Sequence, residues 1–433
     1  MAYLEIRQTG PLSGSYRVQG SKNAVLPMLA ATLLVPGKTT LQRVPKIRDV
    51  EVMLELLTIL GCQFVWADEN LTIDASHVNN WEIPEKLMGQ MRSSIILLAP
   101  ILYRMKKAQV FEPGGCSIGR RPIDIHLYVL QAMGVTLHSQ LIPVSNEQDE
   151  KIVEKDKGEC IFAETNGLKG TSLFLKFPSV GATEQAILAA VVAEGTTAIQ
   201  NAAREPEIAE LCQMLRGMGA NILGDQTGYI VIKGTKTLHE STFEVGADRI
   251  VAATCLSAVA ICAGEIALLD VNASYLDGVI GPFEQIGCDV KIEPNRIIVR
   301  RENPLRPLSY LKTSPYPGFP TDVQSLMMAV LSFANGKSVV EEGIFEGRFR
   351  TAYQLQKMGA EVIIENNQAI LSGGHLHGAN VEAPDLRGGA ALTVAGLGAD
   401  GVTTVYGYEH IVRGYEDLAG MLQTFGAYVY LRE

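Results

Sequence analysis

The sequence contains no apolar run long enough to cross a membrane. Its most apolar stretch, residues 250–264, is shorter than the roughly 18 residues that a spanning helix needs, and Glu265 follows it directly. The first ten residues, MAYLEIRQTG, lack a basic region followed by an apolar stretch, so we expect no signal peptide. These absences favour a cytoplasmic protein that does not associate with a membrane.

Cysteines are few and lack the spacing that binds metals. The chain has seven of them, an odd number, and no C-x-x-C pair. This pattern argues against a disulfide framework and against a metal site. It suits the reducing environment of the cytoplasm.

Long blocks of like charge are also missing. The 433 residues contain 37 Lys and Arg against 47 Asp and Glu, which gives a net charge of −10. An acidic chain without a basic stripe is not the pattern of a nucleic-acid binder. Charged residues make up 19% of the chain and apolar residues 47%, as in ordinary globular proteins, and the length predicts two to three domains.

What the sequence does contain is a unit repeated six times. In each copy a helix-patterned segment ends at a glycine, which is followed by Ala, Val or Cys and then by a strand-patterned segment. Glycine in this position is typical of a helix C-cap. These glycines, spaced 67 to 85 residues apart, are Gly61, Gly134, Gly219, Gly287, Gly359 and Gly426. The repeat predicts an α/β (α+β) fold of six βαβαββ-like units.

The second helix of each unit is apolar on nearly all sides, so we expect it to be buried. Each of these helices nevertheless begins with a polar or flexible cluster: Lys22-Asn23, Arg92-Ser93, Ser179-Val180-Gly181, Asp248-Arg249, Thr321-Asp322 and Asp385-Leu386-Arg387. Capping alone can explain Ser179 and Thr321. It cannot explain the cations, which oppose the positive end of the helix dipole. A shared anionic ligand at converging helix starts would explain them.

Three units per half predict two similar domains. Residues 1–21 precede the first buried helix and are expected to complete the second domain. The predicted domains are therefore residues 22–246, and residues 1–21 together with 247–433. The charged, unpatterned stretch 141–159 is predicted to be a surface loop.

The loops before the first helices are basic, although the protein as a whole is acidic. They carry Lys46, Arg48, Arg121, Arg204, Arg348 and Arg413, an excess that indicates electrostatic focusing on a negatively charged small molecule. One of these loops, PGGCSIGRRPID, places Cys116 among glycines and beside Arg120 and Arg121. Cations stabilise a thiolate, and the glycines predict a mobile loop that closes over the ligand.

These residues resemble the enolpyruvyl transferases. The matching motifs run in order along nearly the whole chain: GSKNAVLP, MRSSI, PGGCSIGRRPIDIH, PSVGAT, NAAREPEI, PYPGFPTD, FEGRF, APDLR and IVRGYE. The resemblance implies two inside-out α/β barrel domains of three units each, with the active site in the cleft between them. It also implies a monomer that needs no metal or organic cofactor.

The reaction implied by the resemblance joins two small molecules. The enolpyruvyl group of phosphoenolpyruvate passes to the 3-hydroxyl of UDP-N-acetylglucosamine through a tetrahedral intermediate, and phosphate is released. This step begins the synthesis of peptidoglycan precursors. Without a cofactor, positioning and electrostatic stabilisation must account for much of the rate enhancement.

The resemblance assigns catalysis to Cys116, Asp322, Lys22 and Arg413. Cys116 matches a cysteine associated with proton donation to phosphoenolpyruvate, with a covalent adduct of that substrate, and with inactivation by the epoxide fosfomycin. Asp322 matches the candidate base for the sugar hydroxyl. Its alternative role is capping, because Thr321 and Gln324 resemble a capping box.

The remaining matches are binding positions. Those for phosphoenolpyruvate are Lys22, Asn23, Arg121, Arg387 and Arg413. Those for UDP-N-acetylglucosamine are Asn23, Arg92, Arg121, Pro122, Ile123, Asp124, Ile125, Ser179, Val180, Gly181, Asp322 and Ile344.

Three other functions stay open. The sister enzyme that acts on shikimate 3-phosphate shares the fold and the cationic pocket, although PGGCSIG and PSVGAT speak against it. A non-catalytic paralogue could bind a nucleotide-sugar, but it would not need the four catalytic matches together. The sequence departs from the family pattern at Ala247, at Val251 and at EGR, residues 346–348, so a divergent copy with another acceptor is also open.

Overall fold

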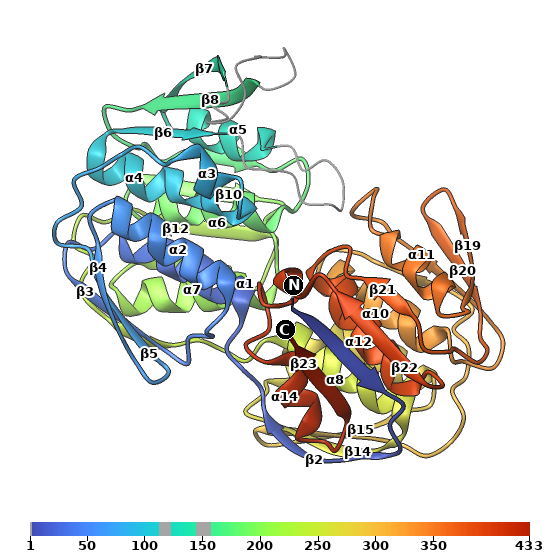
Figure 1. Ribbon diagram of the computed structural model, residues 1–433. Coiled ribbons are helices and arrows are strands. Elements are labelled where there is room, and N and C mark those ends of the chain that lie inside the picture. The colour runs from blue at the N-terminus through green and yellow to red at the C-terminus, as the bar shows by residue number, and fades with distance from the viewer. Residues whose placement is uncertain (1, 112–122, 144–156) are drawn as a thin grey trace.

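The computed structural model describes residues 2–111, 123–143 and 157–433 (Figure 1). Figure 1 shows two lobes, with most of the chain's first half, blue to green, in one lobe, and the second half, yellow to red, in the other together with the blue N-terminal strand β2. Short sheets lie toward the outside of each lobe and helices lie inside.

The first helix of each unit is capped as the sequence predicts. These helices are α2 (Arg48–Ile59), α5 (Asp124–Ala132), α7 (Pro206–Gly217), α9 (Asp277–Gln285), α11 (Arg350–Lys357) and α14 (Leu418–Gln423). Each is followed by its predicted glycine, and all six glycines have a φ between 87° and 111°. A side chain at such a φ is strained, so the prediction of C-cap glycines is confirmed.

The second helices form the centres of the two lobes. They are α1 (Lys22–Thr32), η1 (Arg92–Leu97) with α4 (Leu98–Met105), α6 (Val180–Ala190), α8 (Arg249–Cys262), α10 (Thr321–Leu331) and α12 (Leu386–Gly398). In one lobe α8, α10 and α12 contact one another, and in the other α6 contacts α4 and η1. Every residue of α8 is buried, which agrees with its apolar sequence.

One predicted helix is interrupted. The segment 92–105 begins as the 3₁₀ helix η1 and becomes the α-helix α4 only at Leu98. Pro100 has no backbone N–H, so it cannot bond the carbonyl of Ile96 as an α-helix requires.

Six small sheets cover the helices in the described residues, five with four strands and one with three. Their strand orders are β21 (Asn380–Glu382), β22 (Val402–Tyr406), β1 (Tyr3–Arg7), β23 (Tyr428–Arg432); β11 (Asn221–Leu223), β12 (Tyr229–Lys233), β10 (Thr196–Gln200), β9 (Ser172–Phe174); β13 (Thr242–Glu244), β3 (Lys38–Gln42), β5 (Asn70–Asp74), β4 (Gln63–Ala67); β15 (Asp289–Glu293), β16 (Arg296–Arg301), β14 (Gly264–Leu269), β2 (Leu12–Arg17); β17 (Leu311–Lys312), β18 (Lys337–Glu341), β20 (Gln368–Ser372), β19 (Glu361–Glu365); and β6 (Lys107–Phe111), β8 (Lys157–Glu164), β7 (Thr136–Pro143). Each four-stranded sheet joins one parallel pair to antiparallel pairs. The short elements α3 (Glu85–Met88), η2 (Ala273–Leu276) and α13 (Tyr408–Ile411) complete the description.

The buried apolar residues form two separate cores. One core runs from Ala24 to Val245, and the other combines Leu4 to Val18 with Ala247 to Val429. The N-terminal strands belong with the second core, because β1 pairs with β22 and β23 and β2 pairs with β14. These pairings support the domain boundaries 22–246 and 1–21 plus 247–433, which stay a proposal.

The predicted surface loop 141–159 is too long at both ends. β7 and β8 pair as far as Pro143 and Lys157, so residues 141–143 and 157–159 belong to strands. Main-chain hydrogen bonds hold an antiparallel pair without an alternating side-chain pattern, so this extension could not be predicted from the residues. Within the described ranges, no helix combines the length and the apolar character that spanning a bilayer demands.

Candidate active site

Asp49 joins two of the predicted phosphoenolpyruvate-binding cations. It lies in the first turn of α2, and its Oδ2 is 2.7 Å from Nζ of Lys22, the first residue of α1. Its Oδ1 accepts a 2.8 Å hydrogen bond from Nε of Arg413, which follows α13 in the second half of the chain. The side chain of Asp49 is only 3% exposed, so water screens these ion pairs weakly. One carboxylate thus links both halves at this point.

The protonation states of Lys22 and Asp49 depend on each other and on the nearby arginines. Burial lowers the pKa of Lys22, the ion pair with Asp49 opposes this, and the neighbouring Arg413 and Arg387 lower that pKa further. Burial alone would raise the pKa of Asp49, but Lys22 and Arg413 together bring it below its ordinary value. Asp49 is therefore ionised at neutral pH, and its charge favours the protonated form of Lys22.

Asp322 lies between two buried arginines. It is the second residue of α10, with Oδ1 2.8 Å from Nη2 of Arg348 and Oδ2 3.1 Å from Nη2 of Arg387. The arginine side chains are 2% and 4% exposed, whereas Asp322 is 25% exposed. Two charge-assisted hydrogen bonds therefore fix both carboxylate oxygens of a side chain that solvent can still reach.

Two further aspartates cap buried helices. Oδ1 of Asp248 accepts hydrogen bonds of 2.8 and 3.1 Å from the backbone N–H groups of Ile250 and Val251, at the start of α8. Its Oδ2 accepts a 3.0 Å bond from the backbone N–H of Lys22. Asp385 caps α12 through two backbone N–H groups. Asp248 thereby ties the start of α8, in the second half, to the start of α1, in the first.

Glu342 holds the loop that carries Ile344. Its Oε1 accepts a 2.8 Å hydrogen bond from the backbone N–H of Ile344, and its Oε2 accepts a 2.9 Å bond from Oγ1 of Thr321. The N-cap of α10 is Pro320, so the predicted capping box of Thr321 and Gln324 is wrong. Thr321 is the first helical residue and not the cap, and its hydroxyl donates to the buried carboxylate of Glu342 instead of accepting from the backbone N–H of Gln324.

A second group of predicted residues gathers at the starts of α5 and α6. Ser179 is the N-cap of α6, as expected, and its Oγ accepts a hydrogen bond from Ala182. Nζ of Lys176 lies 4.0 Å from Oδ2 of Asp124, the first residue of α5. The two helices contact each other, and α6 also contacts η1, which Arg92 opens. The remaining members of this group are Ile123, Ile125, Val180 and Gly181, on the same helix starts, while Asn23 is the half-buried second residue of α1.

His126 was not singled out from the sequence, yet it lies inside this second group. Burial, with a smaller contribution from Arg92, lowers its pKa to about 4, and Asp124 opposes both. The imidazole is therefore neutral at neutral pH. Its Nδ1 is buried and has no hydrogen-bond partner among the described residues. A Cβ at position 181 would lie 2.8 Å from its Nε2, so the imidazole packs against the start of α6.

Gly181 is therefore required by His126. We expect Gly181→Ala to lower the free energy of unfolding by about 1–3 kcal/mol, because the buried imidazole must move to admit the methyl group. Gly281→Ala is the control, since Gly281 lies in α9 with nothing within 4 Å of an added Cβ, and it should be neutral or slightly stabilising. Urea unfolding measures both changes. Equal stabilities for the two variants would contradict this packing.

Arg249 and Glu207 form a buried ion pair between the halves. Nε of Arg249, the first residue of α8, donates a 3.0 Å hydrogen bond to Oε1 of Glu207 on α7. Oε2 of Glu207 is buried without a hydrogen-bond partner in the described part of the chain. Burial, together with the charges of Glu207 and Glu205, raises the pKa of the nearby Glu184 to about 8. Glu184 thus lies close to two other carboxylates, and one of them pairs with Arg249.

Glu184 makes stability depend on pH. Its pKa is about 8 in the folded protein and 4.5 in its ordinary state, so the folded state resists ionisation. The contribution of Glu184 to the free energy of unfolding should therefore be highest below pH 4.5. It should fall as the pH rises toward 8, by at most about 1.4 kcal/mol for each pH unit. Burial raises the pKa of Glu210 to about 7, which adds a change of the same sign.

We expect Glu184→Gln to flatten this dependence, because glutamine carries no charge at any pH. Thermal unfolding from pH 5 to pH 9 should show a shallower loss of Tm in the variant than in the wild type. Glu361→Gln, at an exposed position of β19, should keep the wild-type slope. Parallel curves for the Glu184 variant and the wild type would refute the assignment.

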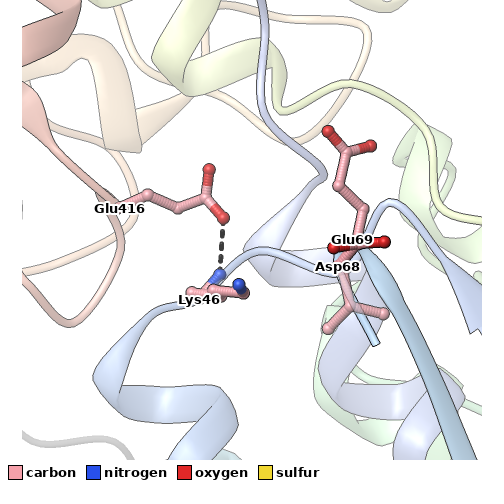
Figure 2. A pocket seen from close by; sticks show the side chains of 5 residues that line it. Lys46, Asp68, Glu69 and Glu416 are labelled. Atoms are coloured by element: carbon pink, nitrogen blue, oxygen red, sulfur yellow. Dashed lines mark hydrogen bonds between the residues drawn. The ribbon is translucent and has the colours of Figure 1, made fainter. Parts of the chain in front are cut away.

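The basic loop residues do not all lie beside Lys22, Arg387 and Arg413. Arg48 is partly exposed and pairs with Glu51 and Glu55, each at 3.1 Å. Lys46 lines a hollow of about 470 Å³ at the junction of the halves, together with Val44, Asp68, Glu69 and Glu416. Figure 2 shows its backbone N–H bonded to Glu416, at 2.6 Å. Three carboxylates against one lysine disfavour an anionic substrate there.

The need for an anionic ligand at the helix starts is weaker than the sequence suggested. Lys22, Arg249 and Arg387 each have a protein carboxylate as partner, namely Asp49, Glu207 and Asp322. These carboxylates offset the unfavourable position of a cation at a helix N-terminus. The cations therefore do not by themselves demonstrate a bound anion.

Three predicted site residues, Cys116, Arg121 and Pro122, lie outside the described residues. The structure therefore places Lys22, Arg387, Arg413 and Asp322 in one region, and it places Arg92 with the starts of α5 and α6 in another. Within the described ranges, no group of His, Cys, Asp and Glu side chains has the arrangement of a metal site.

Sequence reasoning missed Asp49 and the role of Glu342. Asp49 stands in IRDVE, at the start of a helix, where an acidic residue is common and draws no notice. The signal that could have identified it is burial, since an aspartate in a first turn is usually exposed whereas Asp49 is 2% exposed.

The comparisons with known proteins agree on one family. The model of the family described as EPSP synthase (3-phosphoshikimate 1-carboxyvinyltransferase) matches residues 6–422. The chain is 42% identical to UDP-N-acetylglucosamine 1-carboxyvinyltransferase 2 of Caldanaerobacter subterraneus over 417 residues, 96% of each chain. The chain belongs to the enolpyruvyl transferase family. A further member, the UDP-N-acetylglucosamine 1-carboxyvinyltransferase of Finegoldia magna, is 40% identical over 99% of this chain and 98% of its own.

Solved enolpyruvyl transferases share the fold. The enolpyruvyl transferase NikO from Streptomyces tendae superposes with a TM-score of 0.84 at 23% identity, covering 99% of this chain and 98% of its own. EPSP synthase from Acinetobacter baumannii has a TM-score of 0.75 at 18% identity over the whole of both chains. At these identities the likeness concerns the fold alone, and it confirms the predicted two-domain α/β class.

Proposed function

We propose that this enolpyruvyl transferase moves the enolpyruvyl group of phosphoenolpyruvate to the 3-hydroxyl of UDP-N-acetylglucosamine. The observation that carries the proposal is the gathering of Lys22, Arg387 and Arg413 with Asp49 and Asp322 where the two halves meet. Relatives that are 40 and 42% identical over nearly their whole length are named for this acceptor. The reaction begins the synthesis of peptidoglycan precursors.

The cations bind the two anionic groups of phosphoenolpyruvate. Lys22, Arg387 and Arg413 supply donors for its phosphate and carboxylate, and Arg121, beyond the described residues, adds another. The planar fork of arginine suits bidentate contact with either group. Each described cation already pairs with a carboxylate of the protein, so the substrate shares these donors with Asp49 and Asp322.

The chemistry is an addition followed by an elimination. The oxygen of the sugar hydroxyl bonds to C2 of phosphoenolpyruvate while C3 gains a proton, and the hydroxyl proton passes to a base. The bond from C2 to the phosphate oxygen then breaks, phosphate leaves with the electron pair, and C3 loses a proton to restore the double bond. Asp322 orients the hydroxyl and receives its proton, and Cys116 supplies the proton to C3.

The nucleotide-sugar occupies the second group of residues. The start of α6, with Ser179, Val180 and Gly181, directs backbone N–H groups toward the diphosphate. Arg92 adds charge, and residues 121–125 and Ile344 contact the remainder. Asp322 and Ile344 lie in the second half of the chain, so this ligand contacts both domains.

We place the enzyme in the cytoplasm, as a monomer. The six cysteines that the structure describes are all buried and free, which suits a reducing compartment. The monomeric state stays a prediction from the resemblance.

The test is release of phosphate from phosphoenolpyruvate. We expect release by the wild-type protein only when UDP-N-acetylglucosamine is present, and strongly reduced release by Cys116→Ser. Cys62→Ser is a matched control, because Cys62 is buried in the first repeat. Release that does not depend on the nucleotide-sugar, or no release at all, would overturn the proposal.

A further inference from the structure

We propose that Asp49 is a positioning residue, which holds Lys22 and Arg413 together across the two halves in the charged arrangement that an anionic substrate needs. This inference rests on the proposed function of those two cations. It adds to that function a residue that itself donates nothing to phosphoenolpyruvate, since a carboxylate repels the substrate's phosphate and carboxylate.

The geometry divides the two oxygens of Asp49 between the cations. Oδ2 is 2.7 Å from Nζ of Lys22, and Oδ1 accepts the 2.8 Å bond from Nε of Arg413, whose Nη2 is also 3.3 Å from Oδ2. These contacts involve Nζ of Lys22, which has three N–H donors, and only Nε and Nη2 of Arg413, whose guanidinium has five N–H donors in all. Asp49 can therefore orient both cations without using all their donors.

Asp49 is itself held in place from both sides. It belongs to the twelve-residue helix α2, and the backbone N–H of the preceding Arg48 donates a 2.9 Å hydrogen bond to the carbonyl of Val412, next to Arg413. The helix thus docks on the chain segment that carries Arg413. A shift of one half relative to the other would therefore change the distances at Asp49.

The charges around Lys22 explain why a carboxylate is needed. The groups that face it are Asp49 on α2, Arg413 after α13, Arg387 on α12 and, through the backbone N–H of Lys22, Asp248 at the start of α8. Burial and the two arginines all disfavour a charged lysine, and Asp49 opposes them. Without Asp49, Lys22 would lose its proton at a lower pH and would no longer attract an anion as well.

The first experiment compares Asp49→Asn with the wild type across pH. The quantity is kcat/KM for phosphoenolpyruvate between pH 6 and pH 9.5, at saturating UDP-N-acetylglucosamine. We expect the alkaline fall of the variant to begin at lower pH, with a loss of roughly 10- to 100-fold near pH 8.5 and a smaller loss at pH 6.5. The KM for UDP-N-acetylglucosamine should change little. Glu51→Gln, on the same helix and exposed, should follow the wild-type profile.

A purely structural role predicts another result. If Asp49 only stabilises the fold, Asp49→Asn should lower activity by the same factor at every pH, and parallel profiles would overturn the proposal. If Asp49→Asn does not fold, Asp49→Glu takes its place in the experiment, because glutamate keeps the negative charge. It should keep the wild-type alkaline limb even where kcat falls, and a limb shifted to lower pH would overturn the proposal as well.

A readout independent of catalysis separates this inference from the proposed function. The rate at which acetic anhydride acylates Lys22 at each pH, followed by mass spectrometry, reports the fraction of unprotonated amine. We expect the midpoint to move to lower pH in Asp49→Asn and to stay in place in Glu51→Gln. An unchanged midpoint would refute the role of Asp49, even in an active enzyme. A shifted midpoint in a protein that releases no phosphate would support that role and reject the proposed function.

Discussion

Replacement of Asp322 by asparagine is expected to lower kcat by roughly 10²- to 10⁴-fold, the usual contribution of a positioned proton acceptor. Asp322 receives charge-assisted hydrogen bonds from Arg348 and Arg387, one on each oxygen. An amide offers one oxygen, and its NH₂ group would face a guanidinium. The variant therefore loses both the base and the orientation of the side chain. Initial rates of phosphate release measure the effect.

The control for this prediction is Asp289→Asn, at an exposed position of β15. Its rate should stay within about twofold of the wild type, as expected for a surface change. Circular dichroism at the assay temperature shows whether the Asp322 variant is folded. A folded Asp322→Asn variant with a kcat within about threefold of the wild type would mean that Asp322 takes no part in the reaction.

Of the substitutions proposed for Gly181, Glu184 and Arg249, removal of the Arg249 side chain should lower the free energy of unfolding most. Arg249→Met leaves Glu207 buried beside Glu184 and Glu205 with no cation, and breaking a buried pair in this way costs about 3–5 kcal/mol. The side chains of the pair are 8% and 5% exposed, so solvent compensates little. Urea-induced unfolding at pH 8 measures the loss.

A double variant tests the cause of that loss. Arg249→Met combined with Glu207→Leu removes both charges, and its stability should return to within about 1–2 kcal/mol of the wild type. The exposed pair of Arg17 and Glu69 is the control, and Glu69→Gln should cost less than about 1 kcal/mol. If the double variant is as unstable as Arg249→Met alone, the loss arises from packing and not from the unpaired carboxylate.

The parts of the fold that the sequence predicts are those with local causes. The six C-cap glycines and the six buried helices follow from residues within one turn or one helix of each other. The break at Pro100 also has a local cause, but the apolar pattern around it hid the change to a 3₁₀ helix. The ends of β7 and β8 could not be placed, because main-chain pairing leaves no mark on the sequence.

The contacts within the candidate site could not be predicted in the same way, because the residues that pair there are distant in the chain. The sequence identifies the cations Lys22, Arg387 and Arg413 through motifs. It cannot identify their counter-ions, since Asp49 and Arg413 are 364 positions apart. Where a local pattern did suggest a partner, as for Thr321 and Gln324, the buried carboxylate of Glu342, which follows β18, replaced it. Local spacing cannot reveal such competition between acceptors.

The acceptor defines the proposed function, and a competition between two acceptors identifies it. The protein is incubated with phosphoenolpyruvate and equal amounts of UDP-N-acetylglucosamine and shikimate 3-phosphate, and the products are identified by mass spectrometry. We expect enolpyruvyl-UDP-N-acetylglucosamine and phosphate as products, with the shikimate compound unchanged. An enolpyruvyl derivative of shikimate 3-phosphate, or both acceptors recovered intact, would contradict the proposed function.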